Sequence, residues 1–171
     1  ISSAGNSEDF GDLTQARNAA ASASSSTRGI RAGGNPNTDT MDYVTISEKG
    51  NAFDFGDLTV ARRQFGGCSN GTRGVFAVGG PGSSSLNTME FITIASTGNT
   101  TDYGDLVYAA GNLGGTSNGT RGVFGGGAGA AYTNIIQFIT IATTGDAADF
   151  GDLTFTRIPY GATSDSHGGI S

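Results

Sequence analysis

The stretch CSNGTRGVF at residues 68–76 returns as TSNGTRGVF at residues 116–124, and this near-identity decides how the fold is read. Eight of nine matching positions are not a coincidence, so the repeat architecture has to be established before anything else. The first copy begins at Cys68 and the second at Thr116. A period of this length is typical of repeats in which each unit is one supersecondary structure.

Two further words follow the same period. DFGDL or DYGDL begins at Asp9, Asp54, Asp102 and Asp149, so its copies are spaced almost evenly. YVTIS or FITIA begins at Tyr43, Phe91 and Phe138. We therefore predict a single repeat array over positions 1–171, with about 3.6 repeats of roughly 45–48 residues each. Its parts are a partial unit 1–17, three repeats at about 18–62, 63–110 and 111–157, and a terminal partial repeat 158–171.

One loop absorbs the variation in repeat length. The stretches from Asp39 to Arg73, from Asn87 to Arg121 and from Asn134 to Gly168 are equally long, whereas the segment that precedes each of them differs in length between repeats. Packed elements resist insertions and surface loops accept them, so we expect any recognition to lie in these variable loops, at 35–38, 81–86 and 129–133. The candidate recognition residues are Asn35, Pro36, Asn37, Pro81, Gly82, Ser83, Ser84, Ser85, Ala130, Ala131 and Tyr132.

Composition excludes several classes of function. The net charge is −6 with one lysine, Lys49, which argues against binding to nucleic acid or to an anionic membrane surface. No run of apolar residues approaches the length of roughly 18 needed for a transmembrane helix, so we expect no membrane insertion. Glycine is abundant, but apolar words at fixed spacing are not a feature of disordered chains.

Each repeat is expected to form four short antiparallel strands. MEFITIA (89–95) alternates with a period of two, and TDYGDL (101–106) is a second strand kinked at Gly104. NLGGTS (112–117) and TRGVFGG (120–126) are two more, joined by Asn118-Gly119, a pair that favours a type I′ turn. No helical periodicity occurs. The predicted class is all-β, with units of the size of β-propeller blades.

The order of these segments resembles the kelch repeat. VFAVGG (75–80), Asn87, MEFITIA (89–95) and the L-x-x-A-R segments LTQAR (13–17) and LTVAR (58–62) follow the kelch order. The chain departs from the family in having no tryptophan, and its third L-x-x-A-R segment reads LVYAA (106–110). The amino-acid sequences of the repeats are similar to those of the kelch-like repeats of marine bacteriophages, notably cyanophages. The resemblance implies a β-propeller built of kelch-like blades.

The DFGDL words each carry two aspartates that could bind Ca²⁺ or act as acid and base. They recur in every repeat, whereas a propeller has one active site, so we expect a structural role. We predict that one aspartate of each pair forms an ion pair with a repeated arginine. The predicted framework consists of Arg28, Arg73, Arg121, Asp12, Asp57, Asp105 and Asp152.

No catalytic, metal or cofactor site is expected. His167 is the only histidine, so neither a histidine-based triad nor the copper site of galactose oxidase-like kelch enzymes can be assembled from the chain. Cys68 replaces Thr116 and is interpreted as a small buried apolar residue. The sequons at Asn70, Asn99 and Asn118 are interpreted as incidental, because two of these asparagines belong to hairpin turns.

The expected function is that of a structural or adhesive virion component of a bacteriophage: a tail fibre, an appendage or a capsid decoration. Its partners would be other virion subunits, copies of itself and a host surface glycan. The alternative is a secreted or cell-surface kelch module that binds a glycan or a protein. Ile1 aligns with Ile94, in mid-repeat, which predicts a processed or partial chain whose propeller is completed by a longer parent chain or by a neighbouring subunit.

Overall fold

The structure is a computed structural model that describes residues 5–77, 86–159 and 162. All of its regular elements are strands, and this described part contains no helix that could cross a membrane. The twelve strands form three four-stranded antiparallel sheets, so the all-β prediction is confirmed. His167 and the recognition residues Pro81, Gly82, Ser83, Ser84 and Ser85 lie outside the described residues.

Each sheet is a meander whose strands follow the order of the chain. The strands run as follows. The first sheet contains β1 (Ala21–Ser24), β2 (Arg28–Ala32), β3 (Thr38–Thr45) and β4 (Phe53–Arg62). The second contains β5 (Gly66–Ser69), β6 (Arg73–Ala77), β7 (Thr88–Thr93) and β8 (Thr101–Asp105). The third contains β9 (Gly114–Ser117), β10 (Arg121–Gly125), β11 (Ile135–Thr140) and β12 (Ala148–Asp152).

The repeated nine-residue word forms the hairpin between the first two strands of a sheet. Ser69 pairs with Gly74 in the second sheet, and Ser117 pairs with Gly122 in the third. The type I′ prediction is wrong, because neither Asn118 nor Gly119 has a positive φ. Instead the Asn118 side chain accepts the Thr120 and Arg121 amides at 2.8 and 2.7 Å, so an asparagine side chain closes the hairpin.

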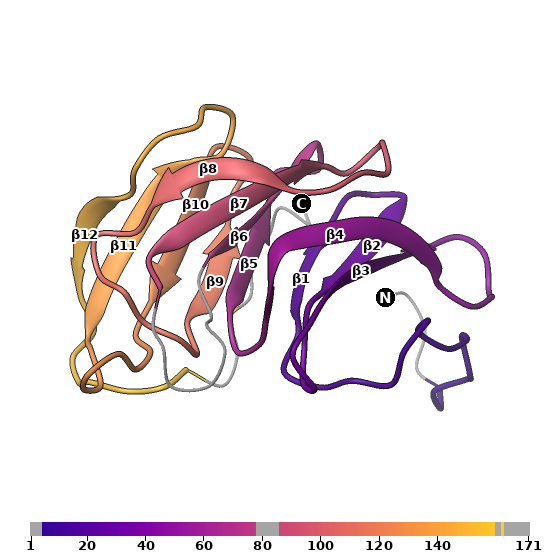
Figure 1. The fold of residues 1–171 in the computed structure, drawn as a ribbon, viewed down its shortest axis with the longest axis horizontal. Coiled ribbons are helices and arrows are strands. Elements are labelled where there is room, and N and C mark those ends of the chain that lie inside the picture. The colour runs from indigo at the N-terminus through magenta and orange to yellow at the C-terminus, as the bar shows by residue number, and fades with distance from the viewer. Residues whose placement is uncertain (1–4, 78–85, 160–161, 163–171) are drawn as a thin grey trace.

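The three sheets stand side by side with their first strands toward the middle of the molecule (Figure 1). β1 contacts β5, and β5 contacts β9. Serine side chains link these strands: the Ser69 hydroxyl donates to the Ser24 carbonyl at 2.9 Å, and the Ser117 hydroxyl donates to the Ser69 carbonyl at 2.8 Å. A side chain on Gly67 would strike the Ser22 carbonyl oxygen, and one on Gly115 would meet the Gly67 carbonyl oxygen at 2.5 Å. Glycine and serine at these positions therefore set the close approach of the sheets.

The core is divided into two layers, one at each contact between consecutive sheets. Each layer combines one face of a sheet with the opposite face of the next, because alternate residues of a strand point to opposite sides. The first layer includes Met41 and Phe55 of the first sheet with Phe76 and Ile94 of the second. The second includes Met89 and Tyr103 of the second sheet with Phe124 and Ile141 of the third. No sheet has a core of its own, so the sheets stabilise one another.

Gly33 and Gly126, one from each described Gly-Gly doublet, pack against the chain of their own repeat. Gly33 and Gly126 have φ values of 58° and 67°, and side chains there would meet the Arg62 and Arg157 carbonyl oxygens at 2.6 and 2.7 Å. Each glycine therefore lies against the C-terminal end of its own repeat, since Arg62 is the last residue of β4 and Arg157 follows β12. The doublet at 79–80 lies outside the described residues.

Candidate functional site

The DFGDL word makes a backbone contact with a turn of the next sheet, which we call the turn contact. Between the first and second sheets, the Gly98 amide donates to the Phe55 carbonyl at 2.7 Å and the Thr100 amide donates to the Asp57 carbonyl at 2.9 Å. The Asp57 amide donates back to Asn99 Oδ1 at 3.0 Å. The same three bonds occur twice more: Gly145 to Tyr103, Ala147 to Asp105 and Asp105 to Asp146, then Gly50 to Phe10, Ala52 to Asp12 and Asp12 to Asn51.

A buried ion pair accompanies the turn contact at two junctions. Arg62 lies 2.5 Å from Glu90, with both side chains 3% exposed, and Thr59 donates to Glu90 through its amide and its hydroxyl. Arg17 lies 2.5 Å from Asp42, with both side chains fully enclosed, and Thr14 donates to the same carboxylate. Burial lowers the pKa of Arg62, and Glu90 opposes that shift. A Thr-x-x-Arg segment is thus matched by a carboxylate of the next sheet.

The third junction has neither charge. Its L-x-x-A-R segment ends in Ala110, and the position of Asp42 and Glu90 is taken by Gln137, which is 1% exposed. Gln137 Oε1 accepts the Val107 amide at 2.8 Å, so the neutral side chain is also satisfied. A charged residue on one side of a junction occurs with an opposite charge on the other, and a neutral residue with a neutral one. This fits the high free-energy cost of an unpaired buried charge.

The predicted ion pairs between the repeated arginines and the DFGDL aspartates are wrong. The guanidinium of Arg28 lies 4.6 Å from the ring centroid of Tyr43, that of Arg73 lies 4.3 Å from Phe91, and that of Arg121 lies 4.7 Å from Phe138. Such contacts are cation–π interactions within one sheet. The arginines also reach across the junctions: Arg28 donates to the Ile94 carbonyl at 3.0 Å, and Arg73 donates to the Ile141 carbonyl at 3.2 Å.

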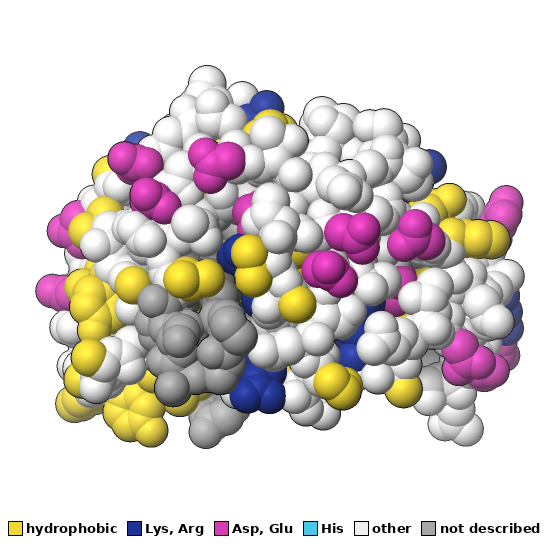
Figure 2. Space-filling view, in the orientation of Figure 1, with side chains coloured by type: hydrophobic (Ala, Val, Ile, Leu, Met, Phe, Trp, Pro, Cys, Tyr) yellow, Lys and Arg dark blue, Asp and Glu magenta, His cyan; other side chains and the backbone are white. Residues whose placement is uncertain are grey.

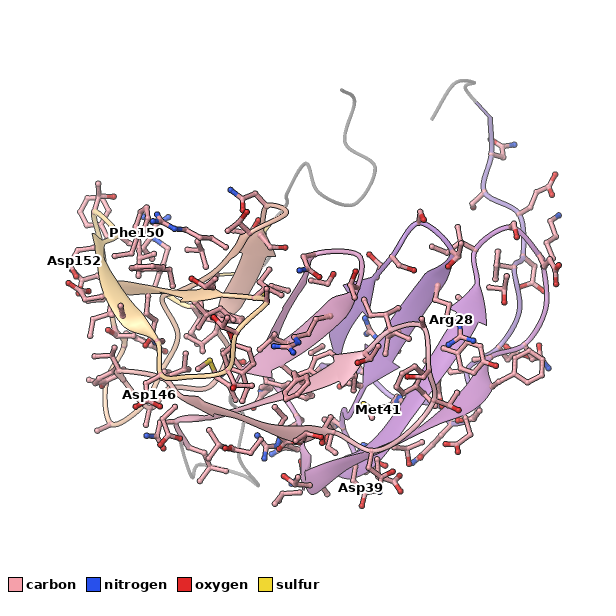
Figure 3. All side chains as sticks on the ribbon, turned by 90° about the horizontal axis from the view of Figure 1, so that it is seen from above. Arg28, Asp39, Met41, Asp146, Phe150 and Asp152 are labelled. Atoms are coloured by element: carbon pink, nitrogen blue, oxygen red, sulfur yellow. The ribbon has the colours of Figure 1, made fainter. Side chains whose placement is uncertain are left out.

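The framework aspartates contribute their backbone, and their side chains are exposed. Asp12, Asp57 and Asp105 take part in the turn contacts through amide and carbonyl groups. Asp152 lies at the outer edge of the third sheet (Figure 3). Within residues 5–77, 86–159 and 162, His, Cys, Asp and Glu side chains do not form a group of three that could hold a metal ion.

The described recognition loops lie beside the segments that precede the first strand of a sheet. Asn35 exchanges backbone hydrogen bonds with Asn18, and its side chain accepts from Arg63 at 2.6 Å. Gly129, next to Ala130 and Ala131, faces the Tyr108 and Ala109 region. These contacts place both loops at the connection end of the sheets. Several loop side chains are exposed there: Pro36, Asn37, Ala130, Ala131 and Tyr132, the last at 62%.

A groove runs along the first strands of the three sheets. Its volume is about 510 Å³, and its lining includes Ser22, Ser24, Ser69, Thr116 and Ser117 with several glycines between them. Hydroxyl and backbone groups at such a surface are suited to polar, uncharged ligands. The groove and the loops both present polar groups, although the Ser69 and Ser117 hydroxyls in the groove already donate to carbonyls of neighbouring sheets.

Neither the scan against protein-family models nor the search of curated proteins found a match to this chain.

Sequence reasoning missed the residues at the junctions. Asp42, Glu90 and Gln137 occupy equivalent positions in the third strand of each repeat, where alternation predicts a position shared with apolar residues. The signal was the joint change of two positions: Arg17 with Asp42, Arg62 with Glu90, and Ala110 with Gln137. The expectation that each arginine pairs with the nearest repeated aspartate pointed to other residues than these joint changes.

Proposed function

We propose that this chain is an array of kelch-like propeller blades that serves as a structural or adhesive component of a bacteriophage virion. The observation that supports this most is the turn contact, which recurs with the same three hydrogen bonds at three positions of the array. Arrays that repeat one contact suit extended or multi-copy assemblies. The proposal assigns the chain no reaction, metal or cofactor.

The side-by-side packing of first strands supports a blade arrangement. In a β-propeller the first strand of each blade faces the axis and the fourth lies at the rim. Here β1, β5 and β9 are neighbours, and serine hydroxyls link them. The segment order shared with kelch repeats adds to this support.

We further propose that the loops at the connection end bind a host surface glycan. Figure 2 shows acidic side chains scattered over the visible face rather than gathered at one place, so an uncharged polar partner fits the surface better than a cationic one. Exposed aromatic rings pack well against sugar rings, and Tyr132 is exposed in one of these loops.

The virion assignment is tested by locating the protein. Antibodies raised against the 171-residue chain should label purified phage particles, and quantitative mass spectrometry should find several copies per particle. Detection only in the lysate, with none in particles purified by density gradient, would contradict the proposal.

The alternative is a secreted or cell-surface kelch module that binds a glycan or a protein, and the polar groove favours it. A glycan array probed with the chain tests the binding common to both proposals. Tyr132→Ala and exchange of the loop at 81–86 for the shorter loop at 35–38 should reduce binding, whereas Phe155→Ala, outside the loops, serves as the exposed-aromatic control. Glycan binding that neither loop change reduces would contradict recognition by the loops.

A further inference from the structure

The third sheet leaves open a face that is covered in the other two sheets. Phe150 is 54% exposed, whereas its equivalents Phe55 and Tyr103 are each 2% exposed. A side chain on Gly104 would meet the carbonyl oxygen of Gly145 at 2.5 Å, but nothing lies within 4 Å of that position on Gly151. A hollow of about 600 Å³ lies on this face, and its lining includes Val123, Ile136, Leu153 and Arg157.

The opposite end of the array leaves open the complementary face of the first sheet. Ile46 is 48% exposed, whereas its equivalents Ile94 and Ile141 are 1% and 0% exposed. The two ends lie far apart: Figure 3 places Phe150 and Asp152 at one end of the molecule and Arg28 of the first sheet toward the other. One chain therefore carries both halves of the contact that joins its own consecutive sheets.

Segment 9–17 partly covers the first sheet. It belongs to no strand, and its side chains Phe10 and Leu13 are 39% and 38% exposed. It is nevertheless held by the full turn contact and by the pairing of Thr14 and Arg17 with Asp42. It makes the polar contacts of a preceding repeat without the sheet that would bury its apolar side chains.

The open edge of the third sheet has almost the same sequence as this segment. DFGDLTFTR at 149–157 matches DFGDLTQAR at 9–17 in seven of nine positions. The two differences, Phe155 for Gln15 and Thr156 for Ala16, spare every residue that holds segment 9–17 on the first sheet. Thr154 and Arg157 stand where Thr14 and Arg17 stand.

We propose that the third sheet of one chain docks on the first sheet of a second copy, with segment 149–157 replacing that copy's segment 9–17. Asp42 of the second copy then pairs with Thr154 and Arg157, and its turn at 50–52 donates to the Phe150 and Asp152 carbonyls. Arg121 reaches the Ile46 carbonyl, as Arg28 reaches Ile94. The docked sheet also brings Val123 and Ile136, which segment 9–17 lacks, onto the exposed Ile46 face.

This contact joins two different surfaces, so its repetition gives head-to-tail chains of molecules unless the rotation closes a ring. Segment 9–17 competes with it, because a tethered segment occupies the site at high effective concentration. Wild-type chains are therefore expected to associate weakly, and release of segment 9–17 is expected to strengthen the association.

Sedimentation velocity over a concentration series distinguishes the effects of Arg17 and Arg157 on self-association. Arg17→Ala removes the ion pair with Asp42 and the hydrogen bonds to the Thr40 and Arg31 carbonyls, so it weakens the tethered segment and should lower the dissociation constant for self-association roughly tenfold or more. Arg157→Ala should raise it by a similar factor. The double variant Arg17→Ala/Arg157→Ala should be monomeric at concentrations where Arg17→Ala associates. If Arg17→Ala associates as strongly with Arg157 removed as with it, or if neither single change alters association, the docking is wrong.

A peptide test covers the case in which Arg17→Ala unfolds. A fluorescent peptide of residues 149–157 is added to the wild-type chain, and its anisotropy is measured with unlabelled 9–17 peptide as competitor. We expect saturable binding that the competitor removes and that Asp42→Asn weakens roughly tenfold or more. The control variant Asp39→Asn, on the same strand but exposed, should bind like wild type. No binding, or equal binding to Asp42→Asn and Asp39→Asn, would overturn the proposal.

Discussion

At the residue scale, a charge is buried at a junction where an opposite charge is buried beside it. Arg62, Thr59 and Thr100 enclose the Glu90 carboxylate. The two threonines donate hydrogen bonds to it, and Arg62 supplies the opposite charge. Gln137 achieves the same satisfaction with backbone groups alone. Two chemically different solutions therefore occupy the same position of one scaffold, and each depends on its partner across the junction.

The pairing predicts how substitutions combine. Arg62→Ala should lower the free energy of unfolding by about 3–5 kcal/mol, because it leaves the Glu90 carboxylate buried without its counter-charge. Adding Glu90→Gln should restore part of this loss, since Ala with Gln is the combination that Ala110 and Gln137 already form. Urea denaturation of the two single variants and the double variant measures the coupling. Additive losses would contradict the pairing.

Cys68 makes the stability sensitive to alkaline pH. The thiol is 2% exposed, and burial raises its pKa from 9.0 to about 12. Above pH 9 the unfolded chain loses this proton while the folded chain keeps it, so the free energy of unfolding should fall as the pH rises from 9 toward 12. Cys68→Ala should show a shallower fall, with the remainder due to Tyr103, whose pKa burial also raises to about 12. Equal slopes in both proteins would contradict this assignment.

At the element scale, the first strands β1, β5 and β9 approach so closely that backbone and serine groups make the contact. Gly67 and Gly115 leave no room for a side chain between neighbouring strands, and Ser69 bonds to both Ser24 and Ser117. Each first strand is the edge strand of its sheet and pairs with one neighbouring strand only. The serine hydroxyls supply hydrogen bonds between these edges, from one sheet to the next.

Gly67→Ala should disrupt this approach. Its added methyl group would strike the Ser22 carbonyl oxygen, so we expect a loss of about 1–3 kcal/mol or more in the free energy of unfolding. Gly119→Ala is the matched control, because nothing lies within 4 Å of the added methyl group, and its effect should stay within about 0.5 kcal/mol. Thermal melts of both variants measure the difference. Similar melting temperatures for the two would remove the claim of close packing.

The sequence predicted the strands well because alternation and turn residues are local signals. FITIA at 91–95 and 138–142 alternates as a strand does, and β7 and β11 cover its first three residues and end at Thr93 and Thr140, before the turns. The hairpin turn was misjudged because Asn-Gly is compatible with more than one turn, and the asparagine side chain decides between them. An ion pair between Arg73 and an aspartate was expected because both residues recur in every repeat. Recurrence does not show which way a side chain points, however, and the Arg73 guanidinium lies over the Phe91 ring. The junction pairs depend on residues of different repeats, which no local pattern brings together.

At the scale of the whole molecule, stability arises between sheets rather than within them. Both core layers lie at junctions, and each junction repeats the turn contact. In such quasi-one-dimensional arrays, a further repeat adds both its own folding energy and one more junction. Whether the addition stabilises the array depends on the residues that the new junction brings together.

Duplication of single repeats should therefore give unequal results. A second copy of residues 18–62 inserted after Arg62 places Thr59 and Arg62 against Asp42, a matched junction. A second copy of residues 63–110 inserted after Ala110 places Ala110 against Glu90, which buries an unpaired carboxylate. Calorimetry should show a higher melting temperature for the first insertion than for the second. Glu90→Gln in the inserted copy alone should rescue the second, and failure of this rescue would contradict the matching rule.

Each sheet is made of four strands that are consecutive in the sequence, and no described strand crosses from one sheet to another. The sheets are therefore linked in series, so a pull on the two ends of the chain loads all three sheets at once, and the sheet with the weakest junctions should yield first. Unfolding of one sheet uncovers the core layer that it shares with its neighbour, so the neighbour should follow, with roughly 150 Å of extended chain released per repeat. Because neighbouring sheets share their core layers, the array should lengthen under tension in a few large steps, each propagating from one junction to the next, rather than strand by strand.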